Sequence, residues 1–366
     1  MDDYNKEKTI VIGHKNPDTD SICSAICYAN LKAALTGKDF QPGRAGQVNE
    51  ETQFVLNYFG VEAPQLIEHV KTEVRDIEIR KIKGVNRNIS LKKAWNTMQE
   101  ANAVTLPAVT EDNVLEGLIT VSDIAQSYMN VYDSSILSKA NTQYSNMIET
   151  LEGALVVGDE NAYFDKGKVL IAAANPDMME FYINKNDLVI LGNRYESQLC
   201  AIEMNAACIV VCMDAKVSRT IRKLAQEHNC NIIVTPHDTF TVARMINQSM
   251  PISHFMKEEN LITFKLTEKT DDIKGIMGQK RYRDFPILDM EGNYIGMISR
   301  RNLLNLRKKQ VILVDHNEAS QTVDGIEHAD ILEIIDHHRI GTLETLEPVF
   351  FRNQPLGCTA TIICQM

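Results

Sequence analysis

The chain has 366 residues, of which 38 are Lys or Arg and 49 are Asp or Glu, so its formal net charge is −11. Hydrophobic residues make up 44% and charged residues 24%, which are ordinary globular values that exclude wholesale disorder. This length provides for about two to four domains with buried cores. The acidic balance argues against a protein that coats nucleic acid, because phosphate contacts need a basic surface.

The sequence predicts neither a membrane helix nor a signal peptide. No apolar run approaches the ~18–20 residues that a membrane helix needs. Residues 1–14 hold an early acidic pair and then a strand-like run, which is unlike a signal peptide. The eight cysteines form no CxxC pair, which favours reduced thiols over disulfides or a zinc site. A cytoplasmic protein without a membrane partner is the expectation.

The N-terminal segment predicts a strand followed by two helices. Residues 8–13 form a short apolar run, and the apolar periodicity from Ser21 to Leu35 predicts a helix that Gly37 ends. A second helix is expected from Glu50 to Phe59. The loop between the strand and the first helix is crowded with acidic side chains.

An internal repeat of about 55 residues follows. The stretches from Val74 to Met129 and from Ile252 to Leu306 share one order of elements. Each predicts a helix, a strand with an internal proline (Pro107 or Pro286), an acidic turn, a strand after Gly, and a closing helix. This repeat resembles the CBS module, two of which commonly pair into a nucleotide-binding unit.

The CBS resemblance implies a ribose contact at the start of the closing helix. Thr120 and Asp123 match the family's pattern in the first copy. The second copy has Ser299 but Asn302 at the matching positions, so the ribose carboxylate is absent there.

Two arginines at the start of the second closing helix suggest a phosphate contact. Arg300 and Arg301 suit an anion there, because a helix N-terminus and guanidinium groups both attract phosphate. The alternative interpretation is that all these positions are plain helix caps and solvated arginines.

Between the two repeats, alternating apolar strands and amphipathic helices from about Tyr144 to Asn247 predict a separate α/β domain. Its arrangement resembles the DRTGG domain, although Asn193 and Tyr195 stand where the family name expects Asp and Thr. A spacer or a dimer surface is the expected role of this domain.

Acidic and imidazole side chains are concentrated in three segments outside the repeats, each directly after an apolar strand. The carboxyl ends of parallel strands are where open α/β sheets place their sites. Strand-end acids also serve as turn formers and caps, which is the alternative reading of any single cluster. The residues are His14, Asp18 and Asp20, then Asp315 and His316, and finally Asp336, His337 and His338.

Carboxylates mixed with imidazoles suit Mn²⁺, Co²⁺ or Mg²⁺ better than structural zinc. Several carboxylates together also suggest more than one cation. Two neighbouring ions can share one carboxylate and clamp the oxygens of an in-line displacement at phosphorus. A phosphate ester or anhydride is the substrate class that this chemistry favours.

These segments closely resemble the DHH phosphoesterases and, within them, the family II inorganic pyrophosphatases, through GHKNPDTDSI and the flanking NEETQFVLNYFGVEAP and FRNQPLGCTATII. The resemblance implies hydrolysis of pyrophosphate with two divalent ions, Mn²⁺ or Co²⁺, and Mg²⁺ entering with the substrate. It assigns His14 and Asp18 to one ion, Asp20 and His337 to the other, and Asp315 to the bridge between them.

The same resemblance places His338 beside the substrate phosphate and gives Asp336 the role of orienting an imidazole. Asn16 and His316 are nearby candidates for polar support. Insertion of CBS modules into such an enzyme resembles the branch of the family that adenine nucleotides regulate. AMP, ADP and ATP are therefore expected regulators, and a homodimer is expected because CBS pairs often associate.

The predicted fold is α/β, with a DHH-type parallel-sheet domain interrupted by a tandem CBS pair that flanks a DRTGG-like domain. The predicted boundaries are 1–70 and 310–366 for the DHH domain, 71–130 and 249–306 for the CBS modules, and 141–248 for the DRTGG-like domain. The family has a further strand-end Asp and a second lobe beyond the position of Met366, so this chain alone is expected to be weak or inactive.

Two other functions stay open at this point. A nucleotide sensor without catalysis would use the CBS pair and keep the phosphatase half for assembly. A related DHH phosphodiesterase would act on short nucleotides or nucleic-acid ends, although the acidic charge and the NPDTDS segment disfavour it. Nucleic acid is not an expected partner.

Overall fold

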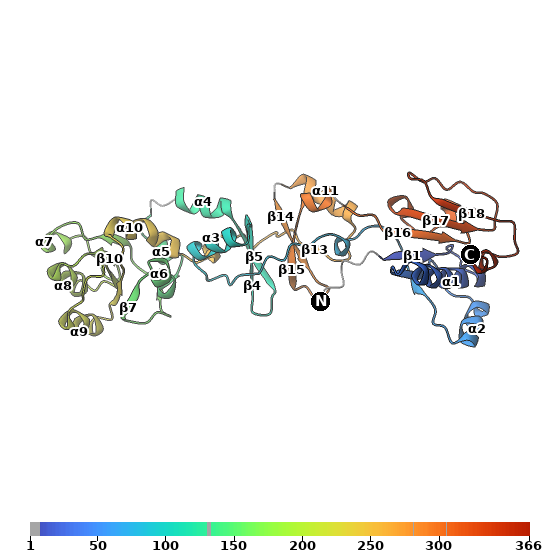
Figure 1. Ribbon diagram of the computed structural model, residues 1–366. Helices are drawn as coiled ribbons and strands as arrows, with labels where there is room; N and C mark the ends of the chain where they lie inside the picture. The colour runs from blue at the N-terminus through green and yellow to red at the C-terminus, as the bar shows by residue number, and fades with distance from the viewer. Residues whose placement is uncertain (1–7, 130–132, 281, 305) are drawn as a thin grey trace. The chain divides into compact units, whose positions relative to one another are not determined.

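The computed structural model describes residues 8–129, 133–280, 282–304 and 306–366 (Figure 1). The predicted domains 1–70, 71–130 and 249–306 include residues 1–7, 130, 281 and 305, which lie outside this part of the chain. The chain divides into two compact units. Unit 1 comprises 1–79, 264–282 and 298–366, and unit 2 comprises 80–263 and 283–297, so the second repeat contributes to both units.

A six-stranded parallel sheet forms the core of unit 1 and combines the two ends of the sequence. Its order is β18-β17-β16-β1-β2-β3, which confirms the predicted α/β class with a parallel sheet. The strands are β1 (Thr9–Ile12), β2 (Phe40–Arg44), β3 (Gln65–Leu66), β16 (Gln310–Val314), β17 (Asp330–Asp336) and β18 (Phe350–Asn353).

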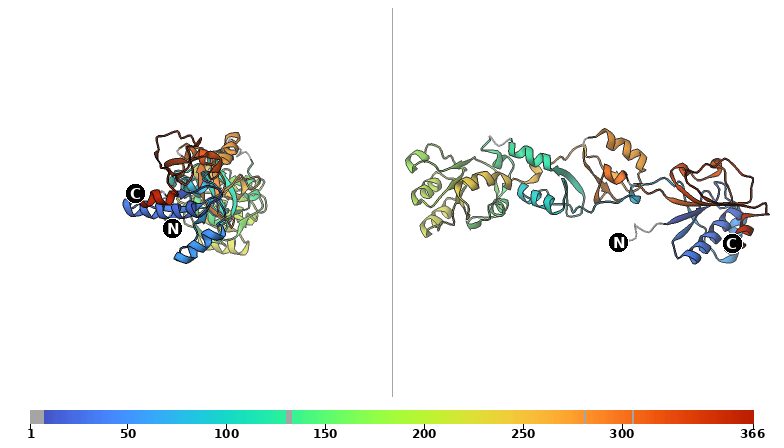
Figure 2. Two further views of the ribbon diagram at one scale, coloured as in Figure 1. Left: turned by 90° about the vertical axis from the view of Figure 1, so that its right-hand side faces the viewer. Right: turned by 45° about the horizontal axis from the view of Figure 1, so that its top comes forward.

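Both faces of this sheet are covered, which explains why its central strands are apolar at successive positions. On one face, α1 (Thr19–Thr36) lies beside α12 (Thr359–Cys364), as Figures 1 and 2 show. Their buried side chains pack with Val11 and Ile312. On the other face, Ile12 and Leu313 pack against the segment around Val323.

The predicted helices of the N-terminal segment are present. Gly37 ends α1 and Gly60 ends α2 (Glu50–Phe59), each in the left-handed conformation that favours glycine. The other elements of unit 1 are short, apart from α11. They are η1 (Val74–Asp76), β13 (Phe264–Lys265), α11 (Thr270–Gln279), η4 (Arg300–Leu303), η5 (Ala319–Gln321) and η6 (Ile326–His328).

The repeat predicted from the sequence is visible in the order of elements. The first copy consists of α3 (Leu91–Glu100), β4 (Thr105–Val109), β5 (Leu115–Thr120) and α4 (Val121–Met129). The second copy has α11, β14 (Asp284–Leu288) and β15 (Tyr294–Ser299) in the same order. It closes with η4, a four-residue 3₁₀ helix, so the predicted closing helix is present but shorter than α4.

A second parallel-type sheet confirms the separate α/β domain between the repeats. Its order is β7-β12-β11-β10-β9, with β7 antiparallel to its neighbour and the other pairs parallel. Its strands are β7 (Ala154–Val157), β9 (Val169–Ile171), β10 (Leu188–Leu191), β11 (Cys208–Val211) and β12 (Asn231–Val234).

Short helices and one strand pair complete this part of unit 2. The helices are α5 (Ile136–Lys139), α6 (Tyr144–Thr150), α7 (Pro176–Met179), α8 (Tyr195–Glu203), α9 (Arg219–Glu227), α10 (Thr239–Met245), η2 (Ile246–Ser249) and η3 (Ile252–His254). The pair consists of β6 (Thr142–Gln143) and β8 (Tyr163–Phe164).

Two exclusions made from the sequence agree with the described residues. None of their helices is long and apolar enough to cross a membrane. All eight cysteines are free thiols, and four of them, Cys200, Cys208, Cys212 and Cys230, are buried in the domain between the repeats.

We expect Ile312→Ala to destabilise the parallel sheet of unit 1 by about 2–5 kcal/mol, because a fully buried side chain leaves a cavity. Native-state hydrogen exchange at the amides of β1 and β16 measures this loss. Ile340→Ala is the matched control, since Ile340 is 74% exposed and its loss costs no more than about 0.5 kcal/mol. Equal effects of the two substitutions would contradict this account of the core.

Candidate metal centre and nucleotide sites

The predicted metal ligands come together at one edge of the six-stranded sheet. β16 lies between β1 and β17, and all three strands run in the same direction. The register pairs Ile12 with Leu313 and Val314 with Ile335. The residues that directly follow these strands are therefore neighbours at the carboxyl edge, the position at which open α/β sheets place their sites.

Asp315 occupies the centre of this edge and is 1% exposed. Its Oδ2 lies 3.4 Å from Nε2 of His14, and its Oδ1 lies 3.5 Å from Nε2 of His337. Thr359 donates a hydrogen bond from Oγ1 to Oδ1 at 2.9 Å, whereas Oδ2 accepts no hydrogen bond from the described residues. Burial raises the pKa of Asp315 above its ordinary value.

The backbone of Asp315 is in the left-handed region, with φ of +65°. Its amide donates to the carbonyl oxygen of Ile335 at 2.9 Å, which continues the pairing of β16 with β17 past the end of the strand. A non-glycine residue in this conformation costs energy and persists only where its surroundings hold it. This turn aims the carboxylate across the sheet edge.

His14 and Asp18 lie on the β1 side of Asp315. Asp18 is the N-cap of α1, and its Oδ1 accepts a hydrogen bond from the amide of Ser21 at 2.9 Å. Its Oδ1 also lies 3.9 Å from Nε2 of His14. One possible ligand atom from each of His14, Asp18 and Asp315 lies within 4.8 Å of the others. The carboxylate of Asp315, whose Oδ2 lies 3.4 Å away, raises the pKa of His14.

His337 lies on the β17 side of Asp315. Its Nδ1 is 3.0 Å from the carbonyl oxygen of Leu356, which leaves Nε2 directed toward the carboxylates. Nε2 lies 3.8 Å from Oδ2 of Asp20. A second group of possible ligands within 4.8 Å of one another consists of Asp315, His337 and His338.

Asp20 has a structural task in addition to the predicted one. Its Oδ2 accepts from the amide of Thr359 at 2.6 Å, and its Oδ1 accepts from the amide of Ala360 at 2.8 Å and from Oγ of Ser24 at 3.1 Å. The carboxylate therefore satisfies the first amides of α12, as a capping residue does. It joins α1 to α12 beside His337.

Asp336 is fully buried and orients the imidazole of His338. Its Oδ1 lies 2.8 Å from Nδ1 of His338 and also accepts hydrogen bonds from the amides of His337, at 2.8 Å, and His338, at 3.1 Å. A carboxylate that binds Nδ1–H leaves Nε2 of the ring free as an acceptor. The ring of His338 is half exposed.

The two residues predicted as polar support differ in their surroundings. His316 is 1% exposed, with Nδ1 at 2.9 Å from the carbonyl oxygen of Val314 and no hydrogen-bond partner for Nε2 among the described residues. Burial lowers the pKa of His316 to about 4, so its ring is neutral near pH 7. Asn16 is exposed on the loop before α1.

The two repeats use one geometry at the predicted ribose positions. In the first copy, Oδ2 of Asp123 accepts from the amide of Thr120 at 2.8 Å and from its Oγ1 at 2.7 Å. In the second copy, Oδ1 of Asn302 accepts from the amide of Ser299 at 2.9 Å and from its Oγ at 2.8 Å. Asn302 also donates from Nδ2 to the carbonyl oxygen of Glu78 at 3.0 Å, which a carboxylate cannot do.

The arginines predicted to bind phosphate are placed differently from each other. Arg300 donates from Nε and Nη2 to the carbonyl oxygen of Met277, at 2.9 and 2.6 Å, and from Nη2 also to Lys280. These hydrogen bonds attach its guanidinium group to the backbone at the end of α11. Arg301 is exposed.

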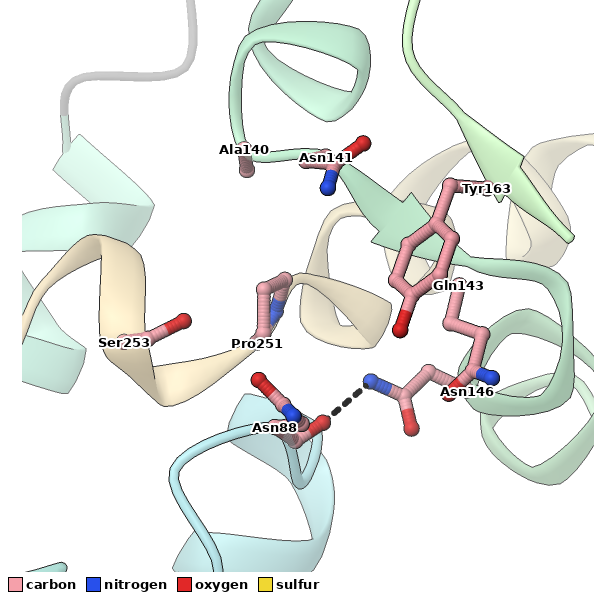
Figure 3. Close-up of a pocket in the computed structure, with 8 residues that line it drawn as sticks. All are labelled: Asn88, Ala140, Asn141, Gln143, Asn146, Tyr163, Pro251 and Ser253. Atoms are coloured by element: carbon pink, nitrogen blue, oxygen red, sulfur yellow. Dashed lines mark hydrogen bonds between the residues drawn. The ribbon is translucent and has the colours of Figure 1, made fainter. Parts of the chain in front are cut away.

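A polar pocket of about 140 Å³ lies in unit 2, where η3, α5 and the pair β6–β8 approach one another (Figure 3). Uncharged side chains line it, and Asn146 donates to the carbonyl oxygen of Asn88 at 2.8 Å across it. None of the residues predicted to bind nucleotide lines this pocket.

Comparison with known families and solved structures identifies the domains of the chain. A model of the CBS domain matches residues 74–130 and 252–309, and a model of the DRTGG domain matches residues 146–249. The structure resembles the crystal structure of the CBS and DRTGG domains of the regulatory region of Clostridium perfringens pyrophosphatase, complexed with the activator diadenosine tetraphosphate. The TM-score is 0.60 at 34% identity, over 63% of this chain and 100% of that one.

The chain belongs to the pyrophosphatases that carry a CBS and DRTGG regulatory region. It is 40% identical over 98% of its length to a cobalt-dependent inorganic pyrophosphatase of Clostridium perfringens. It is 35% identical, again over 98%, to a probable manganese-dependent inorganic pyrophosphatase of Thermotoga maritima. The chain spans 66% and 65% of the length of these two relatives. The domain boundaries stay predictions.

Divalent metal ions fit the donor set at the carboxyl edge of the six-stranded sheet. Carboxylates mixed with imidazoles are ligands for Mn²⁺ and Co²⁺. Asp315 presents one oxygen to each imidazole, and its Oδ2 is buried without a hydrogen-bond donor among the described residues. A buried carboxylate oxygen needs a compensating partner, and a cation between Asp315 and His14 would supply one.

Sequence reasoning missed two residues of this site, Asn317 and Thr359. Asn317 donates to Asp336, and Thr359 donates to Asp315. The only available signal was their position, directly after the VDH and GC segments, because neither residue type is a preferred metal ligand.

Two substitutions of Asp18 distinguish its role as the helix N-cap from its predicted role as a metal ligand. Without metal, we expect Asp18→Asn to be as stable as the unsubstituted chain, because Asn is an equally good N-cap, whereas Asp18→Ala loses about 0.5–2 kcal/mol. Both variants bind Mn²⁺ more weakly, because both lose an anionic ligand. Denaturation without metal and calorimetric titration with Mn²⁺ check the two effects. Unchanged Mn²⁺ affinity in both variants would remove Asp18 from the ligand set.

Proposed function

We propose that this chain carries the dinuclear metal centre of an inorganic pyrophosphatase regulated by adenine nucleotides. The observation that carries the proposal is the buried carboxylate of Asp315 between the imidazoles of His14 and His337. Each oxygen of this carboxylate faces one imidazole. A carboxylate placed in this way can serve two neighbouring ions. The identity with pyrophosphatases over 98% of the chain supports pyrophosphate as the substrate.

The ligands divide between the two sides of Asp315. His14 and Asp18 would hold one ion, Asp20 and His337 would hold the other, and Asp315 would serve both. The distances of 3.4 to 3.9 Å between the paired atoms support this division. When bound, the two ions supply the Lewis acidity that polarises phosphate oxygens.

Side chains of the site would orient pyrophosphate and respond to its negative charge. The reaction is P₂O₇⁴⁻ + H₂O → 2 HPO₄²⁻, so one P–O bond breaks, one forms, and the two protons of water end on the products. His338 faces the substrate with Nε2, because Asp336 binds its Nδ1. The four carboxylates of the site would repel pyrophosphate by themselves, so the cations are needed to reverse the local field.

His337→Ala and Asp315→Ala should each lower the rate of pyrophosphate hydrolysis by at least about 1000-fold, since each removes a ligand whose ion stabilises the transition state by several kcal/mol. Release of phosphate from pyrophosphate by the protein, in the presence of Mn²⁺, measures this rate. His328→Ala is the matched control, because His328 contacts Glu327 and Asp271 away from the sheet edge. Hydrolysis of a dinucleotide but not of pyrophosphate would overturn the proposal in favour of a phosphodiesterase.

The CBS pair is the proposed regulatory site. The relative's regulatory region is described with a bound activator, diadenosine tetraphosphate. In this chain Asp123 and Thr120 have the hydrogen-bonded arrangement at the start of α4 that the ribose contact would use. A carboxylate there can accept hydrogen bonds from two ribose hydroxyls, whereas the amide of Asn302 already donates to Glu78. We therefore assign the stronger ribose contact to the first copy.

Asp123→Ala should weaken AMP binding at least about 10-fold, because a hydrogen bond to a charged group contributes about 1.5–3 kcal/mol. Calorimetric titration of the full chain with AMP measures the affinity. Glu111→Ala, which removes an exposed carboxylate from the same module, should bind AMP as the unsubstituted chain does. The ribose role of Asp123 is wrong if both variants bind AMP equally well, and the regulatory proposal fails if the unsubstituted chain binds neither AMP nor ATP.

We also propose a cytoplasmic homodimer. Eight free thiols suit a reducing compartment, and CBS modules commonly associate. Sedimentation analysis of the chain, at concentrations that span the micromolar range, tests the dimer. A monomer at all concentrations would contradict it.

A further inference from the structure

Asn317 lies two residues after Asp315 and is 4% exposed. Its side-chain amide reaches across to the turn that follows β17. Nδ2 donates to Oδ2 of Asp336 and, at 3.0 Å, to the carbonyl oxygen of Arg339. Oδ1 accepts a hydrogen bond from the amide of Gly341. One side chain on the turn after β16 is thus bonded to three points of the neighbouring turn.

Only a carboxamide can make this set of bonds. The NH₂ group of Asn has two donor hydrogens and its oxygen is an acceptor, so all three contacts of Asn317 are satisfied at once. An aspartate at this position would have no donor for Asp336 or Arg339, and it would place a second negative charge against the buried carboxylate of Asp336. The residue type at 317 is therefore specific to the contact.

Close packing at Gly341 supports the same conclusion. A Cβ atom at Gly341 would lie 2.7 Å from Oδ1 and 2.8 Å from the carbonyl oxygen of Asn317. Real side chains do not tolerate such a distance, so the backbone of the second turn approaches Asn317 at a position without a side chain. Both turns are shaped for this one connection.

The connection continues to the metal ligands through Asp336. Oδ2 of Asp336 accepts from Asn317, while Oδ1 accepts from the amides of His337 and His338 and lies 2.8 Å from Nδ1 of His338. Displacement of Asp336 would therefore move the imidazole of His338 and the backbone that carries the imidazole of His337. Asp315 is held by two other hydrogen bonds, one from its amide to the carbonyl oxygen of Ile335 and one to its side chain from Thr359.

We infer that Asn317 is a positioning residue that fixes the separation between Asp315 and the imidazole of His337, and so determines the affinity of the ion on the β17 side. The inference rests on the proposed dinuclear centre. The ion on the β1 side would be held by His14 and Asp18, and the three side-chain hydrogen bonds of Asn317 all go to the other side, so the affinity of that ion should not depend on Asn317. Positioning groups of this kind typically change metal affinity about 10–100-fold.

The affinity of each ion can be measured separately in a variant that lacks a ligand of the other ion. In His14→Ala, the full chain keeps the ion on the β17 side, and addition of Asn317→Ala should weaken Mn²⁺ binding about 10–100-fold in a calorimetric titration. In His337→Ala, which keeps the ion on the β1 side, Asn317→Ala should leave the Mn²⁺ affinity unchanged. Asn30→Ala is the matched control, because the amide of Asn30 makes a local bond within α1, to the carbonyl oxygen of Ile26.

The outcomes distinguish failure of the positioning role of Asn317 from failure of the proposed dinuclear centre. If the unsubstituted chain binds two Mn²⁺ ions and Asn317→Ala weakens both equally or neither, the positioning role is wrong and the dinuclear centre stands. If the unsubstituted chain binds no Mn²⁺, the dinuclear centre itself is wrong. If circular dichroism shows that the Asn317→Ala variant does not fold, Asn317→Asp is used instead, because it keeps the volume of the side chain. The same selective weakening of Mn²⁺ binding on the β17 side is expected of Asn317→Asp.

Discussion

The parallel pairing of β1, β16 and β17 is the constraint on which the candidate centre depends. Three strands that run in one direction end at one edge, so the side chains that follow them must meet there. The pairing joins distant parts of the chain, since Thr9 bonds to Gln310 across 301 positions. Side chains on both faces of the sheet are packed into buried clusters, so the packing fixes the positions of the strands and of the residues that follow them.

Four carboxylates at this edge are stabilised by different parts of the fold. Asp18 caps α1, Asp20 binds the first amides of α12, and Asp336 accepts from Asn317 and from the turn after β17. Asp315 differs, because one of its oxygens is buried without a donor among the described residues. Buried carboxylates are tolerated when they are paired, so the uncompensated oxygen of Asp315 is the atom of this edge that most needs a cation.

The regulatory region shows how one repeated geometry can take on two tasks. Both copies end β5 or β15 with a hydroxyl residue that bonds to a side chain three positions later. The carboxylate of Asp123 keeps acceptor capacity for a ligand, whereas the amide of Asn302 donates to the backbone at Glu78. A single change from carboxylate to amide thus converts a candidate ligand contact into a structural one.

The sequence by itself determined which elements exist and which residues end them. Apolar runs followed by Asp and His predicted the strands and the metal ligands, and the repeat with its internal prolines predicted the CBS pair. The strands and the repeat are present in the structure because hydrophobic periodicity is local, whereas the metal ligands stay a prediction. The length of the closing helix was not predictable in this way: in the described residues it is a four-residue 3₁₀ helix after Ser299, whereas α4 in the first copy is a nine-residue α-helix.

Only the tertiary structure decided how those residues share their contacts. The order of the strands places Asp315 between the two imidazoles, and the close approach of two turns gives Asn317 its three bonds. The same is true of Asp20 at the start of α12 and of Arg300 at the end of α11. These contacts join residues far apart in the chain, and long-range pairing and side-chain direction leave no periodic trace in the sequence.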